Sequence, residues 1–253
     1  MVKRLLTVLA AVGLLTVAGC AAGQDGAEAQ ELLRQATEAQ ADVGSMTFSM
    51  NVVGAAGGQQ FTMQVSGGGY LKGEKEGDMV MRASMAAPNM PATSFEFVSR
   101  KGATYVNLNG SWQKVPGGMG ETQTEQLEQQ LAGFDFTKYV TDVAVEEGTT
   151  FLGEPVTKIV GTIDTKGLMG GLFGQLGAAG GQDGVGIAPP QEALDALGPV
   201  RAVLYISDVT HLVKAVRLAF DVDFQGETGT FEVNYALRSV NEPVEIPKPA
   251  VAA

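Results

Sequence analysis

The chain has 253 residues, of which 45% are hydrophobic, and it carries a formal net charge of −11 with a single cysteine and a single histidine. So acidic a surface argues against binding nucleic acid, and against binding anionic lipid through charge. One cysteine cannot form a disulfide within the chain, and one cysteine with one histidine leaves no His/Cys metal cluster. The composition therefore predicts a protein with no cofactor and no bound metal.

The N-terminus begins with Lys3 and Arg4, continues with a mostly apolar run from Leu5 to Ala18, and then reaches Cys20. The run is too short to span a hydrocarbon core of ~30 Å comfortably, and a basic start before it is typical of an export signal. Val-Ala-Gly-Cys matches the bacterial lipobox, whose cysteine is acylated. We expect a signal peptide at 1–19, a lipidated Cys20 with a short tether at 20–28, and a lipid anchor on the extracytoplasmic face of the cell membrane. The alternative is an ordinary signal peptide with a chance cysteine. Removal of Lys3 and Arg4 would bring the net charge to −13.

The first half of the remaining chain predicts one helix followed by strands. Apolar residues between Ala29 and Val43 recur at helical spacing, and Gly44 ends that helix. From Ser45 onward apolar and polar residues alternate, and glycines interrupt the runs at 57–58 and 67–69. Short consecutive strands with one apolar face indicate an antiparallel meander.

The second half predicts two helices and further strands. Thr122–Leu131 opens with a capping box, and a further helix has Pro189 and Pro190 at its start and Gly198 past its end. Strands are expected at Val143–Glu146, Val156–Ile163, 200–206, 212–222 and 229–238. We therefore expect an α+β domain over 29–249, built as a single large curved antiparallel sheet, a half-barrel with helices packed on its concave face.

The sequence is poor in catalytic groups and predicts a protein that is not an enzyme. Ser207, Asp208 and His211 lie within five residues, where a Ser/His/Asp triad is conceivable. Neighbours in a hairpin turn do not face each other as a triad requires, so the favoured interpretation is a turn between two strands. The glycines at 67–69 are not followed by the residues of a phosphate-binding loop.

The informative pattern is a set of methionines and phenylalanines that alternate with polar residues. Methionine is unbranched and polarisable, and it adapts to irregular apolar shapes. A sheet face of this kind suits a pocket for flexible acyl chains, although a plain core packed against helices would give the same pattern. The predicted pocket residues are Met46, Phe48, Met50, Phe61, Met63, Met79, Met81, Phe95 and Phe97.

The segment 170–186 contains eight glycines. Leu168, Leu172 and Phe173 lie at helical spacing just before and within it, and each glycine costs a helix about 1 kcal/mol relative to alanine. One hypothesis is a lid that opens at low cost over the mouth of the pocket, with these three apolar residues as further pocket lining. The alternative is a surface loop.

Several stretches together resemble the actinobacterial LppX/LprA/LprF/LprG lipoproteins, which have a LolA-like fold. They are the lipobox, Ser45-Met-Thr-Phe-Ser, Thr104-Tyr-Val-Asn-Leu-Asn-Gly-Ser-Trp-Gln-Lys, Phe151-Leu-Gly-Glu-Pro-Val-Thr-Lys-Ile-Val-Gly-Thr-Ile-Asp and Asn241-Glu-Pro-Val-Glu-Ile-Pro-Lys-Pro. The resemblance covers roughly 29–249 and departs in the glycine-rich segment. It implies a half-barrel with an apolar cavity that binds an acylated lipid or glycolipid, carried through the envelope, in some members beside an export pump. The alternative function is a regulatory or scaffolding lipoprotein that binds a protein partner and has a filled core.

Overall fold

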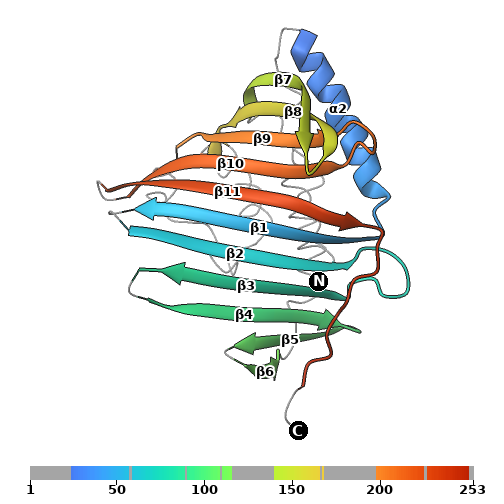
Figure 1. Ribbon diagram of the computed structural model, residues 1–253, viewed down its shortest axis with the longest axis vertical. Coiled ribbons are helices and arrows are strands. Elements are labelled where there is room, and N and C mark those ends of the chain that lie inside the picture. The colour runs from blue at the N-terminus through green and yellow to red at the C-terminus, as the bar shows by residue number, and fades with distance from the viewer. Residues whose placement is uncertain are drawn as a thin grey trace, which may run out of the picture.

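The structure is a computed structural model, and it describes residues 24–56, 59–88, 90–108, 110–115, 140–165, 167, 198–224 and 227–250. Within these ranges it contains one helix, α2 (Gln24–Ala41), and an eleven-stranded sheet (Figure 1). The strands are β1 (Ser45–Ala56), β2 (Gln59–Tyr70), β3 (Met79–Ala87), β4 (Met90–Arg100), β5 (Ala103–Leu108), β6 (Ser111–Lys114), β7 (Val140–Phe151), β8 (Glu154–Ile163), β9 (Val200–Ser207), β10 (Val213–Phe224) and β11 (Glu227–Val240).

The sheet consists of two meanders joined in the middle. Its strand order is β6-β5-β4-β3-β2-β1-β11-β10-β9-β8-β7, and every pairing is antiparallel. The first and last strands, β1 and β11, therefore lie side by side at the centre, as Figure 1 shows in blue and red. The predicted single antiparallel sheet is confirmed.

Tight turns connect several of the hairpins. Arg100 pairs with Ala103, so that only Lys101 and Gly102 lie between β4 and β5, and both have positive φ (50° and 75°). The same arrangement joins β7 to β8 through Leu152 and Gly153, with φ of 51° and 82°. Two consecutive residues with positive φ are the mark of a type I′ turn, whose twist matches that of the strands.

Helix α2 packs on one face of the sheet at its β7 end. Ala29, Leu33 and Ala36 are at most 1% exposed and lie against side chains of β8, β9 and β10 such as Ile159 and Leu204. Spacings of four and three residues place them on one stripe of the helix. The helix begins at Gln24, inside the segment predicted as a tether, so the predicted start at Ala29 is too late.

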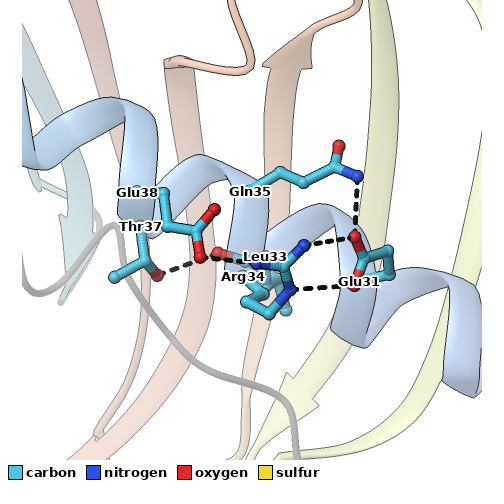
Figure 2. A network of polar contacts seen from close by, with 6 residues as sticks. All are labelled: Glu31, Leu33, Arg34, Gln35, Thr37 and Glu38. Carbon is cyan, nitrogen blue, oxygen red and sulfur yellow. Dashed lines mark hydrogen bonds and ion pairs between the residues drawn. The ribbon is translucent and has the colours of Figure 1, made fainter.

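The outer side of α2 carries an exposed ionic network (Figure 2). The guanidinium of Arg34 donates to both carboxylate oxygens of Glu31, at 2.9 and 2.6 Å, and it also pairs with Glu38. These hydrogen bonds from Arg34, followed by one from Gln35, lower the pKa of Glu31 to about 2. Because all of these groups are exposed, the network adds little to stability.

The core consists of two clusters on the same face of the sheet. One lies under α2, and the other surrounds Met46, Phe48 and Met79. Tyr235 packs against both clusters, and its burial raises its pKa to about 12. The face that carries both clusters is called the apolar face below.

The C-terminal segment returns across the other face of the sheet. The backbone N–H of Val244 donates to the Tyr70 hydroxyl at 3.0 Å, and that hydroxyl donates to the Val244 carbonyl at 3.0 Å. Val244 also lies over Gly68 of β2, where an added Cβ would be 3.0 Å from Val244 Cγ1. Figure 1 shows the segment running past the ends of β2 to β5.

The remaining fold predictions concern residues that the structure does not describe. The helices expected at Thr122–Leu131 and after Pro190, the glycine-rich segment and Cys20 lie outside the described residues. The half-barrel with helices on its concave face therefore stays a prediction. No helix among the described residues has the length and apolar character needed to cross a bilayer.

Candidate functional site

The register of the strands places the predicted methionines and phenylalanines on the apolar face. Phe48 of β1 lies opposite Gly67 of β2, which lies opposite Met81 of β3 and then Phe97 of β4. The next row runs from Met50 through Val65 and Ala83 to Phe95. Met46, Phe61, Met63 and Met79 share this face because they lie an even number of residues from these positions along the same strands.

Glycine in β2 makes room for these large side chains. A Cβ on Gly67 would lie 2.6 Å from the Val80 carbonyl oxygen and 3.0 Å from the Phe48 ring. Without that Cβ, Phe48 can lie beside the β2 backbone and stack on Tyr235, with ring centroids 5.9 Å apart. The glycine run at 67–69 thus serves packing within a strand rather than a loop.

Burial divides seven of the predicted pocket residues into two groups. Met46, Phe48 and Met79 are 1–2% exposed and belong to the core. Met50, Met63, Met81 and Phe97 are only partly buried and border that core. The structure brings all these residues to one face, and whether they line a lipid pocket stays a prediction.

The β3–β5 end of the apolar face carries large apolar side chains that are exposed. Met85 is 40% exposed, Phe95 37% and Leu108 52%. Phe95 and Leu108 are direct cross-strand partners, and Met85 lies two residues from Ala83, the partner of Phe95 on β3. These three residues form what we call the apolar rim. Clustered exposed apolar side chains mark binding sites more often than isolated ones do.

A row of aromatic rings on β2, β11 and β10 also belongs to the apolar face. Phe61 packs on Phe231 with centroids 5.4 Å apart, and Phe231 stacks on Phe220 at 5.3 Å. Phe61 was predicted from the alternation in β2, whereas its neighbours come from strands far away in the sequence. Such contacts cannot be read from one segment.

A second feature, absent from the sequence predictions, is an open groove of about 960 Å³ on the opposite face. Most of its lining consists of polar side chains that alternate with the methionines and phenylalanines, such as Ser49, Gln64 and Arg82. Of the predicted pocket residues that the structure describes, only Met50 and Phe95 contribute to it. The alternation of these polar side chains with apolar ones can be read from the sequence, but the groove cannot.

The predicted turn at Ser207–His211 is confirmed. Ser207 is fully buried, and its hydroxyl donates to Glu154 and accepts the backbone N–H of Thr210 at 2.9 Å. Its hydroxyl is therefore engaged with a carboxylate and the turn backbone. Hydrogen bonds from Lys214 and then Ser207 lower the pKa of Glu154. These groups hold the β7–β8 and β9–β10 turns together, which is a structural role.

Other predicted residues of the site cannot be placed. Cys20, Leu168, Leu172 and Phe173 lie outside the described residues. Within the described ranges, no group of three His, Cys, Asp or Glu side chains is arranged to hold a metal ion.

Comparison with known proteins gives distant structural similarities. No family model matches the chain, and no curated protein matches it. The crystal structure of lipoprotein LppX from Mycobacterium tuberculosis is 15% identical, with a TM-score of 0.46, over 86% of this chain and 97% of that one. The crystal structure of LprF from Mycobacterium bovis is 19% identical, with a TM-score of 0.45, over 90% of this chain and 100% of that one. Because these identities and TM-scores are low, neither structure carries an argument about what this chain binds.

Proposed function

We propose that this protein is a membrane-anchored lipoprotein that binds the acyl chains of a lipid or glycolipid on its apolar face and carries them in the cell envelope. The observation that carries the proposal is the apolar rim of Met85, Phe95 and Leu108, which continues the Met/Phe face outward from the buried core. The lipobox at Cys20 supplies the expected anchor.

The chemistry of the rim favours an apolar ligand of irregular shape. Thioether and aromatic side chains adapt to flexible chains, and each CH₂ removed from water contributes about 0.8 kcal/mol. Beside the rim, Met50, Met63 and Met81 are partly buried, so the apolar surface deepens from the rim toward the core. A ligand on the rim would therefore bury apolar surface that is continuous with the core.

The proposal is tested with Phe95→Asp in the full-length protein, purified and extracted with organic solvent. A carboxylate on the rim would be desolvated by a bound acyl chain, so the co-purifying lipid detected by mass spectrometry should fall at least about tenfold. The matched control is Val53→Asp, because Val53 is also 37% exposed and lies on the opposite face, between Asn51 and Ala55 of β1. Its lipid content should equal that of the wild type.

Two results would contradict the proposal. Wild-type protein without extractable lipid would favour the regulatory or scaffolding alternative, which the buried side chains of Met46, Phe48 and Met79 also suit. Equal lipid loss in both variants would show that added charge, and not the rim, decides retention. The lid hypothesis for Leu168, Leu172 and Phe173 stays a separate prediction.

A further inference from the structure

The groove owes its depth to one row of side chains that crosses the sheet. In its middle, Ser66, Ser49, Ala236 and Ala215 lie on four neighbouring strands and pair in turn, so small side chains form the floor. Toward one edge the row continues with Arg82, Glu96, Asn107 and Trp112, and toward the other with Tyr205. Large side chains at both ends of the row leave a channel over the small-residue floor, with β3 on one side and β9 on the other.

Two polar atoms in the groove lining have no hydrogen-bond partner. The side-chain oxygens of Asn51 and Asn107, both lining residues, are shielded from solvent and unpaired. An unpaired buried polar group costs about 1–3 kcal/mol, and such a group calls for an explanation. Rotation of either amide about its Cβ–Cγ bond would present a donor and an acceptor to a ligand in the channel.

The charges in the groove nearly balance, which restricts the kind of ligand. Arg82 pairs with Glu96 at 2.8 Å, and Glu232 accepts a hydrogen bond from Asn234 at 2.8 Å. Arg238 donates to Ser49 at 2.8 Å, and the Arg217 guanidinium lies 5.6 Å from the centre of the Tyr205 ring. A polyanion would meet two carboxylates in the groove and a chain of net charge −11.

An acyl chain or an apolar peptide is also a poor match. It would strip water from guanidinium, carboxylate and amide groups without replacing their hydrogen bonds. A peptide could not extend the sheet here either, since the groove lies on a face and not at an edge. A neutral, hydroxyl-rich ligand would satisfy the amides and serines. Phe151, which lines the groove and packs on Tyr205 with ring centroids 5.6 Å apart, offers apolar ring surface.

We propose that the polar face of the sheet binds a neutral glycan chain in this groove, with Asn51 and Asn107 as hydrogen-bonding residues. The glycan would lie over the small-residue floor. Most of the lining lies on the opposite side of the sheet from the apolar face, because adjacent residues of each strand point to opposite sides, although Met50 and Phe95 border both surfaces. The glycan site goes beyond the lipid-binding function and does not depend on it.

The experiment measures binding of the full-length protein to an array of neutral and acidic glycans. The protein is kept in a zwitterionic detergent without a sugar headgroup, since a glycoside detergent would compete. Ser66→Trp should fill the floor and lower affinity for the neutral glycan at least about tenfold, as expected for the loss of a few hydrogen bonds. The control is Gln60→Trp, because Gln60 is exposed on the same face of the same strand and lies outside the groove lining.

A second variant keeps the test decisive if Ser66→Trp folds poorly. Asn51→Leu removes an amide that already lacks one partner, so it should lower glycan affinity by about tenfold without lowering the melting temperature. The proposal is overturned if wild-type protein binds no neutral glycan, or if it binds only acidic glycans. Equal binding by wild type, Ser66→Trp and Asn51→Leu would overturn it as well.

Discussion

At the scale of single residues, Glu154 is the carboxylate with the clearest structural role. It accepts from Lys214 Nζ at 2.8 Å and from the Ser207 hydroxyl, and these hydrogen bonds lower its pKa from 4.5. A carboxyl group whose pKa is lower in the folded than in the unfolded protein stabilises the fold fully at pH values above its pKa in the unfolded protein. That contribution is lost as the pH falls through the folded pKa, below 4.5.

We expect Glu154→Gln to lower the free energy of unfolding by about 1.5–3 kcal/mol at pH 7, the usual contribution of a hydrogen bond to a charged group. The difference from wild type should shrink as the pH is lowered below about 4.5, because the wild-type carboxyl group then becomes protonated. Urea unfolding followed by circular dichroism at several pH values measures this. Glu245→Gln, at an exposed position, is the control, and a difference independent of pH would contradict the assignment.

At the scale of elements, α2 shows that burial and not charge holds a helix on a sheet. Leu33 is 1% exposed and lies in the core, whereas its neighbour Arg34 takes part in the network of Figure 2 with 55% of its side chain exposed. Deleting a buried leucine side chain costs the transfer energy of its carbons and leaves a cavity. Exposed ion pairs contribute between nothing and about 1 kcal/mol.

Leu33→Ala should therefore lower the free energy of unfolding by about 2–5 kcal/mol, whereas Arg34→Ala should leave it nearly unchanged. Chemical denaturation of the two variants side by side measures both values. The two residues are adjacent on one helix, and replacing either by alanine changes helix propensity by a similar small amount. The comparison between the two variants therefore reports packing against ion pairing. A larger effect from Arg34 would mean that the network matters more than packing.

At the scale of the whole molecule, attachment to the membrane is expected to depend on one residue. Cys20→Ala should release the protein into the soluble fraction, because the acyl chains on Cys20 are the expected anchor and the acidic chain has little attraction for anionic lipid. Fractionation after a high-salt wash, followed by immunoblotting, measures the distribution. Ser45→Ala, downstream of the lipobox, is the control, and a Cys20→Ala protein that still sediments with membranes would refute the anchor assignment.

The sequence by itself determined which residues form strands and which of their side chains share a face. Period-two alternation around Met46–Met50 and Phe61–Val65 depends only on neighbours along the chain, so it was readable without a structure. The burial of Met46 and Phe48 on that face followed from their apolar character, whereas Phe95 on the same face is exposed. The turn at Ser207–His211 was predictable for the same local reason.

Only the tertiary structure decided how these strands meet. The pairing of Thr47 with Ser239 joins residues 192 positions apart, and no local pattern specifies that register. The same holds for the floor of the groove, where Ser66, Ser49, Ala236 and Ala215 come together from four strands. Small residues become a channel only when cross-strand pairing sets them in one row, because a side chain's neighbours in a sheet come from other strands.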